Sequence, residues 1–199
     1  MSAPLTHHGS NRYLDPYTKL WTTKILPGEY AVVPMGEVVV TAVGSCIAAC
    51  IHDRVLGIGG MNHFMLPTSV GGDWAGQSSA ARYGNYAMEY LINEILKQGG
   101  KRTQLEAKIF GGGVMMASQI AVGDMNIDFA KAYLQTEGIP LKAVDVGGAY
   151  SRKVYFTPQT GEVSLKKLSV QNNATLSDRE ASYAKNLKIG SLSGEVELF

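Results

Sequence analysis

The stretch Val38–Pro67, VVVTAVGSCIAACIHDRVLGIGGMNHFMLP, contains both cysteines of the chain and two of its four histidines. Its β-branched and apolar runs are separated by glycines and polar residues, a pattern that is typical of short consecutive β-strands. Together with the upstream run GEYAVV, the runs EVVVT, CIAACIH and LGIGGMNHFML predict a first sheet of four strands.

The last two of these runs predict an antiparallel hairpin. Asp53 and Gly57 are turn-forming residues, so the turn is expected in HDRVLG. A loop centred on Arg54–Val55 would place Cys46 directly opposite His63, on the same face, with Cβ atoms about 4.5–5.5 Å apart. This geometry depends on the register, because a slip of one residue would send the two side chains to opposite faces.

A thiol beside an imidazole indicates nucleophilic catalysis. The pKa of an isolated thiol is about 8.5, whereas a neighbouring imidazolium lowers it to about 3.5–7.5 and so produces the nucleophilic thiolate. We therefore expect Cys46 to attack and His63 to transfer protons, with the hydroxyl of Thr41 holding the ring and that of Ser45 as the alternative. Gly44 permits a sharp turn, and its N–H or that of Cys46 can stabilise an oxyanion.

Two other interpretations of these side chains stay open. A free cysteine in a β-rich core is usually a small hydrophobe, which suits Cys50 well. A zinc site would combine Cys46, Cys50 and His52 from one strand with His63 across the hairpin. This spacing matches no usual set of zinc ligands, and ligands two and four residues apart on a flat strand converge poorly on a tetrahedron. We therefore expect neither a metal nor a cofactor.

The chain has 199 residues, 45% of them hydrophobic, which is enough for one domain with a sizeable core. We expect an N-terminal arm over residues 1–25, a single domain over 26–170, and a tail over 171–199 in which SDREASYAKNLK forms a surface helix. Within the domain, the sequence predicts helices over ARYGNYAMEYLINEILKQGG and, capped by Asp124 or Asn126, over NIDFAKAYLQTEG. Further strands are expected over LEAKIF, LKAVDV, RKVYFT and EVSLKKL, so the fold class is α/β (α+β).

The charge balance narrows the choice of partners. Lysine and arginine number 18 against 17 acidic residues, so the chain has no electrostatic reason to bind nucleic acid or an anionic membrane. Arg152 and Lys153 are expected on the surface, where they either face solvent or meet an acidic partner.

The sequence contains no secretory signal pattern and no 18-residue apolar stretch, so we expect a cytoplasmic protein with free thiols. The loop over residues 67–81, with Trp74, is long enough to form a lid over a site.

Several motifs in order resemble the CheD family, the chemoreceptor glutamine deamidases of bacterial chemotaxis. GSCIAACIHD followed by IGGMNHFMLP carries the resemblance in the hairpin, and LPGEYAV precedes it. RYGNYAMEYLINEILKQG, AKIFGGG, VGDMN, GIPLKAVDVGG and RKVYFTPQTGEV follow it. The resemblance extends from about Asn11 to Leu168, so residues 26–170 are expected to form a CheD-like catalytic domain.

The resemblance implies a three-layer sandwich of mixed and antiparallel sheets with helices on one side, similar to the catalytic domains of deamidating toxins. It also implies Cys46 as nucleophile with His63 and Thr41, hydrolysing receptor glutamine side chains, or glutamyl methyl esters, through a thioester without a cofactor. The implied partners are the cytoplasmic helical bundle of a methyl-accepting chemoreceptor and a CheC-type phosphatase. A non-catalytic adaptor and a cysteine hydrolase with another substrate remain alternatives. Gly111–Gly113 would line a substrate groove or form a tight turn.

Overall fold

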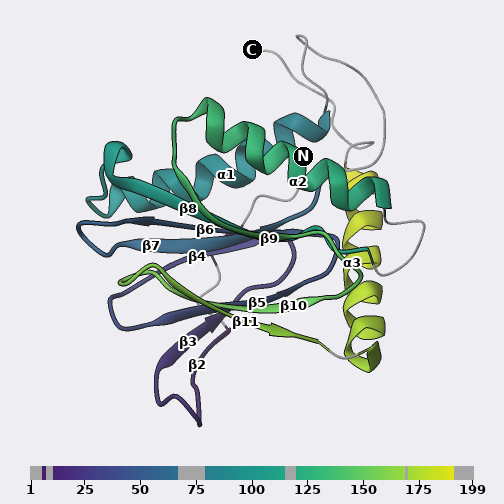
Figure 1. The fold of residues 1–199 in the computed structure, drawn as a ribbon, viewed down its shortest axis with the longest axis horizontal. Coiled ribbons are helices and arrows are strands. Elements are labelled where there is room, and N and C mark those ends of the chain that lie inside the picture. The colour runs from purple at the N-terminus through teal and green to yellow at the C-terminus, as the bar shows by residue number, and fades with distance from the viewer. Residues whose placement is uncertain (1–5, 8–10, 67–78, 115–119, 169, 191–199) are drawn as a thin grey trace.

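The computed structural model describes residues 6–7, 11–66, 79–114, 120–168 and 170–190, so most of the expected lid, residues 67–78 with Trp74, lies outside the described residues. The described chain forms three layers (Figure 1). Helices α1 (Ser79–Lys97) and α2 (Ile120–Thr136) cover one face of a six-stranded sheet, and a five-stranded sheet packs on its other face. The predicted α+β sandwich with helices on one side is confirmed.

Both sheets are mixed. In the first sheet the strands follow the order β1 (Thr6–His7), β4 (Glu29–Val33), β7 (Gly59–Phe64), β6 (Ile47–Asp53), β8 (Leu105–Gly111) and β9 (Leu141–Val146). In the second the order is β11 (Glu162–Lys167), β10 (Arg152–Thr157), β5 (Val38–Val43), β3 (Trp21–Lys24) and β2 (Arg12–Leu14). A short 3-10 helix over Arg102–Gln104 precedes β8.

Strand β5 does not belong to the first sheet, so the prediction of one four-stranded sheet is wrong at this strand. It lies between β10 and β3 in the second sheet, while β4, β6 and β7 form part of the first. Val39 and Val43 of β5 belong to the same buried cluster as Ala48 and Cys50 of β6, so the two strands stack across the layers (Figure 1). The chain therefore crosses between the sheets at Gly44–Cys46. The N–H groups of this segment take part in the hydrogen-bond ladder of neither sheet.

The register of the β6–β7 hairpin also differs from the prediction. Ala48 lies opposite His63 and Ile47 opposite Phe64, two residues away from the expected pairing. The N–H of Gly57 donates to the carbonyl of Asp53, so the turn contains four residues and not two. Because the shift is an even number of residues, Cys46 stays on the same face as His63 and becomes its diagonal neighbour.

The two ends of the described chain add to the sandwich. Strands β2 and β3, within the segment expected as an arm, extend the second sheet, and Ile25 is buried. At the other end, helix α3 (Val170–Gly190) confirms the expected helix but is longer and lies across the edge of both sheets (Figure 1). The division of the chain at residues 26 and 170 stays a prediction. None of the helices in the described ranges is long and apolar enough to cross a membrane.

Arg152 does not lie on the surface as expected. Its side chain is 1% exposed and its guanidinium lies 2.6 Å from a carboxylate oxygen of Asp145. The same nitrogen donates to the carbonyl of Gly147 at 2.7 Å. Arg152 lies on the inward face of β10, where Asp145 neutralises its charge. Of the two residues, only the outward-facing Lys153 remains available to a partner.

We predict that Asp53→Asn lowers the free energy of unfolding by about 1–3 kcal/mol at neutral pH, because the carboxylate accepts hydrogen bonds from the N–H groups of Val55, Leu56 and Lys101. Burial alone would raise the pKa of Asp53, but these bonds outweigh it and lower the pKa below its ordinary value of 3.8. The stabilisation is thus present above pH 3.8 and is lost as the pH falls below it. Urea unfolding across this range measures the effect, with Asp128→Asn on the exposed surface of α2 as the control. Equal losses in the two variants would contradict the prediction.

Candidate active site

The crossing segment Gly44–Cys46 is anchored by its carbonyl groups. The N–H of Gly113 donates to the carbonyl of Gly44 at 2.6 Å, and the N–H of Gly112 donates to that of Cys46 at 2.8 Å. A Cβ atom on Gly111, which has φ of 120°, would lie 2.1 Å from the Cys46 carbonyl oxygen. The glycine run is therefore required for this close approach, which agrees with the turn hypothesis for these residues.

Asn126 anchors the remaining carbonyl of the segment. Its side-chain Nδ2 donates to the Ser45 carbonyl, and its Oδ1 accepts from the N–H of Leu66 at the end of β7, both at 2.8 Å. The prediction of Asp124 or Asn126 as a helix cap is wrong, since α2 begins at Ile120 and Asn126 lies buried within it. Asparagine is a poor helix former, and that is the sequence signal that sets this residue apart.

With all three carbonyls anchored, the N–H groups of Gly44, Ser45 and Cys46 converge on one carboxylate, that of Glu180 in α3. Gly44 N lies 2.7 Å and Cys46 N 3.4 Å from Oε1. Ser45 N lies 2.8 Å and Ser45 Oγ 2.6 Å from Oε2. The segment forms an anion-binding nest, and Glu180, which is 1% exposed, fills it. Glu180 is not predicted as a site residue from the sequence, because it lies in a polar segment without a motif.

His63 of β7 points into the space between the two sheets, where it meets Thr41 of β5. Thr41 Oγ1 donates to the carbonyl of Ile25 at 2.8 Å and lies 2.8 Å from His63 Nδ1. A hydroxyl has one proton, so Thr41 accepts at its oxygen and His63 carries its proton on Nδ1. Nε2 is left as a base without a hydrogen-bond partner among the described residues. Ser45, the alternative hydroxyl, donates to Glu180 instead.

Cys46 completes the cluster. Its Sγ, a ring nitrogen of His63 and a carboxylate oxygen of Glu180 lie within 4.8 Å of one another. Cys50 and His52, the other members of the zinc alternative, are not in this cluster. Each oxygen of Glu180 already accepts two hydrogen bonds, which uses the four lone-pair positions of a carboxylate and disfavours its coordination to a metal.

The electrostatics of the pair differ from the expected thiolate and imidazolium. Burial, reinforced by the nearby Glu180 carboxylate, raises the pKa of the Cys46 thiol well above its ordinary value. Burial lowers the pKa of His63 to about 4. Both side chains are no more than 1% exposed. In this arrangement the pair is therefore neutral at pH 7, and the expectation of a thiolate does not hold for it.

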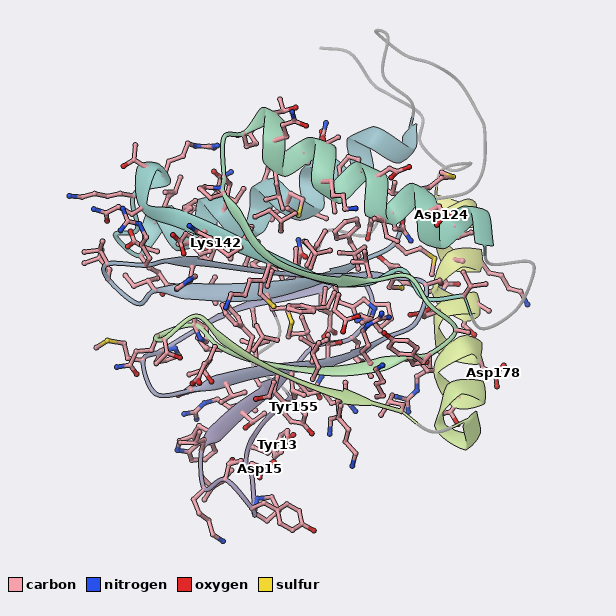
Figure 2. All side chains as sticks on the ribbon, viewed as in Figure 1. Tyr13, Asp15, Asp124, Lys142, Tyr155 and Asp178 are labelled. Atoms are coloured by element: carbon pink, nitrogen blue, oxygen red, sulfur yellow. The ribbon has the colours of Figure 1, made fainter. Side chains whose placement is uncertain are left out.

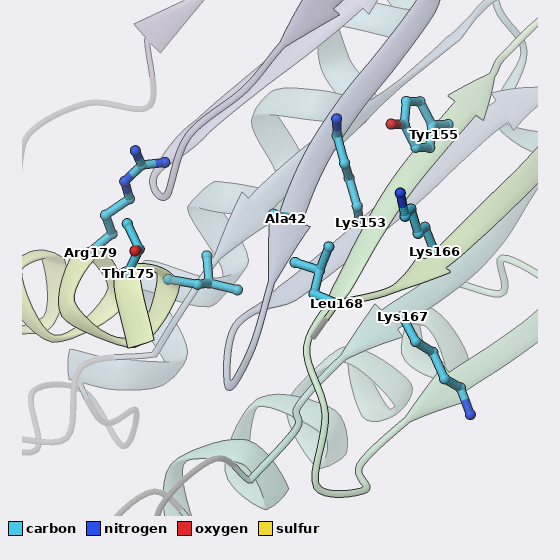
Figure 3. A pocket seen from close by; sticks show the side chains of 9 residues that line it. Ala42, Lys153, Tyr155, Lys166, Lys167, Leu168, Thr175 and Arg179 are labelled. Atoms are coloured by element: carbon cyan, nitrogen blue, oxygen red, sulfur yellow. The ribbon is translucent and has the colours of Figure 1, made fainter. Parts of the chain in front are cut away.

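A groove of about 690 Å³ lies beside α3, on the outer face of the second sheet (Figure 3). Four cationic side chains line it, and none of its described lining residues is acidic. The lining residues are Ala42, Lys153, Tyr155, Lys166, Lys167, Leu168, Thr175, Leu176 and Arg179. The groove thus offers a positively charged surface next to the helix that covers the site.

The fold and the site define a three-layer α+β protein with a buried cysteine–histidine pair at the end of its two sheets. The family model for CheD chemotactic sensory transduction matches residues 65–167. A relative from Methylobacillus flagellatus is 50% identical over 96% of this chain and 95% of its own length. Relatives from Halorhodospira halophila and Janthinobacterium are each 49% identical, over 95% and 97% of this chain and 89% and 96% of their own lengths. The chain belongs to the CheD family.

All three relatives carry the name "Probable chemoreceptor glutamine deamidase CheD". Among solved structures, the hypothetical protein YfiH of Bacillus licheniformis aligns with 61% of this chain and 51% of its own, with a TM-score of 0.39 and 14% identity. That likeness is too distant to indicate a function.

We predict that His63 makes the stability of the protein fall between pH 6.5 and 4. The pKa is lowered to about 4 from an ordinary 6.5, so the unfolded chain takes up the proton first as the pH falls. Stability is complete above pH 6.5 and decreases by about 3 kcal/mol on the way to pH 4. The test compares the free energy of unfolding of wild type with that of His63→Gln across this pH window. Other groups titrate in both proteins, so the difference between the two curves reports on His63. Parallel stability curves would show that His63 is not buried in its neutral form.

Proposed function

We propose that the chain hydrolyses the side-chain amide of glutamine residues in chemoreceptors, giving glutamate and ammonia. Membership of the CheD family and relatives of that name at about half identity over nearly the whole chain support this activity. The observation that carries the proposal is the juxtaposition of Cys46 and His63 with a nest of N–H groups that binds a glutamate carboxylate. A glutamate side chain is also the group that the reaction leaves behind.

The first half of the reaction forms a thioester. Cys46 Sγ attacks the amide carbon while Nε2 of His63 takes the thiol proton. The N–H groups of Gly44, Ser45 and Cys46 stabilise the negative charge that develops on the amide oxygen. His63 then returns the proton to the nitrogen, and ammonia leaves as the carbon–nitrogen bond breaks. Thr41 keeps the ring in the tautomer that leaves Nε2 free.

The second half consumes water. Nε2 of His63 takes a proton from a water molecule, whose oxygen attacks the γ-glutamyl thioester in the same nest. The carbon–sulfur bond breaks, the thiol of Cys46 recovers its proton, and a glutamate side chain is released. The balance is one amide and one water in, one carboxylic acid and one ammonia out, without a metal or a cofactor. A glutamyl methyl ester fits the same steps with methanol as the leaving group.

We place the reaction in the cytoplasm, where the helical bundle of a chemoreceptor is the substrate and a CheC-type phosphatase is a second partner. The cationic groove beside α3 supports binding of an acidic partner surface, with Lys153 and Lys166 among its walls. An adaptor that binds these partners without turnover is the alternative function. It needs the same surfaces but not the thiol.

Cys46→Ala separates the two functions. We expect this change to abolish ammonia release from a receptor fragment, because it removes the thiol that clusters with His63 and Glu180. Cys50→Ala is the matched control, since Cys50 is also buried and lies in the same cluster between the sheets. Cys50→Ala should keep the activity within about threefold, because it removes only the Cys50 thiol, a group about the size of a methyl, from the core.

The measurement is ammonia release together with intact-mass analysis of the receptor fragment. Binding of the fragment is followed in parallel, and it should survive Cys46→Ala. Unchanged deamidation in Cys46→Ala would contradict the proposed mechanism. Binding without any deamidation by the wild-type protein would favour the adaptor, and turnover of small amides in preference to the receptor would indicate another cysteine hydrolase.

A further inference from the structure

Helix α3 covers the active site with one of its faces. Leu176, Glu180, Tyr183 and Ala184 lie at positions i, i+4, i+7 and i+8, so they point the same way. Leu176 and Glu180 are buried, and Tyr183 and Ala184 pack against the hydrophobic clusters of the sandwich. Among the described positions of this face, the carboxylate of Glu180 interrupts the apolar residues.

The contacts of this face tie α3 to the site. The hydroxyl of Tyr183 is hydrogen-bonded to that of Tyr83 at the start of α1. Its ring covers Gly28, where a Cβ atom would lie 2.5 Å from the Tyr183 hydroxyl oxygen. The N–H of Gly28 in turn donates to the carbonyl of His63 at 2.7 Å. The helix therefore closes over Cys46 and His63 and leaves neither accessible to a second macromolecule.

A carboxylate at this position has the chemistry of the reaction product. Glu180 is a glutamate whose two oxygens accept from three consecutive N–H groups and from the Ser45 hydroxyl. Its carboxylate lies within 4.8 Å of both Cys46 Sγ and a ring nitrogen of His63, where the proposed reaction would leave its own carboxylate. An ion pair cannot explain the burial, because all of these partners are neutral groups of the nest.

We infer that α3 is an intramolecular product analogue: Glu180 occupies the subsite for the side-chain amide of the substrate, and α3 must leave before a substrate binds. This inference rests on the proposed deamidase function for the identity of the product. The surface on which α3 packs then indicates what kind of substrate replaces it. This surface fits a helix whose glutamine has apolar residues four positions before it and three or four positions after it.

Alkylation of Cys46 by iodoacetamide tests whether α3 protects the site. The experiment uses the full chain in a Cys50→Ala background, so that one thiol is followed. We expect Glu180→Ala to raise the alkylation rate about tenfold or more, because the buried hydrogen bonds that hold α3 are lost. Asp178→Ala is the matched control: Asp178 lies on the side of α3 that faces away from the sheets (Figure 2), and this change should leave the rate unchanged.

The inference would be overturned if Cys46 were alkylated at the same rate in wild type and in Glu180→Ala. This holds whether both rates are fast, so that α3 does not protect the thiol, or both are slow, so that Glu180 does not hold α3. Glu180→Met, which has a side chain of similar length but no carboxylate and no hydrolysable amide, repeats the test if Glu180→Ala does not fold. Thermal unfolding of each variant shows whether a faster rate reflects release of α3 or loss of the fold.

Glu180→Gln also tests the product analogy directly. It places a glutamine amide in the subsite, and we expect the protein to hydrolyse it with water to glutamate and ammonia. Peptide mass analysis should recover glutamate at this position in Glu180→Gln but not in Glu180→Gln combined with Cys46→Ala. Asp178→Asn is the control and should keep its amide.

The outcomes separate this inference from the proposed function. Receptor deamidation by wild type together with a stable amide in Glu180→Gln would refute the product analogy and leave the function intact. Protection of Cys46 by Glu180 without any deamidation of a receptor would refute the function and leave α3 as a cover of the site.

Discussion

The site depends on how the backbone of Gly44–Cys46 is held by its carbonyl groups. Gly112, Gly113 and Asn126 donate to the three carbonyls, so the three N–H groups must face the other way. The segment can adopt this form because it connects two sheets and has no ladder to complete. A nest of this kind binds an anion or stabilises a developing one, which serves both a carboxylate and an oxyanion.

The closed site has a chemical consequence for the cysteine and the histidine. Burial favours the neutral form of each, and the Glu180 carboxylate adds to this for the thiol. The same helix that blocks access therefore also keeps the thiol protonated. If α3 leaves, water enters and the negative charge beside Cys46 is removed, and both changes favour the thiolate. Access and activation are thus coupled through one helix.

Much of this arrangement follows from the sequence, and the failures have physical causes. Short-range patterns predicted the strands and helix α1, and the even spacing across the hairpin kept Cys46 and His63 on one face. The layer of β5 was missed because a strand that is buried along nearly all of its length does not reveal which sheet it joins. The register was wrong by two residues because the side chain of Asp53 stabilises a longer turn. Glu180 was missed because its partners, three backbone N–H groups and the Ser45 hydroxyl, are 134–136 residues away in the sequence.

Amide hydrogen exchange at Gly44, Ser45 and Cys46 tests the central claim most directly, because it reports on the nest itself. We expect these three N–H groups to be protected in wild type and to exchange faster in Glu180→Ala. The N–H groups of Gly112 and Gly113, which donate to the opposite side of the segment, should stay protected in both proteins. Rapid exchange of the three nest amides already in the folded wild-type protein would contradict the account.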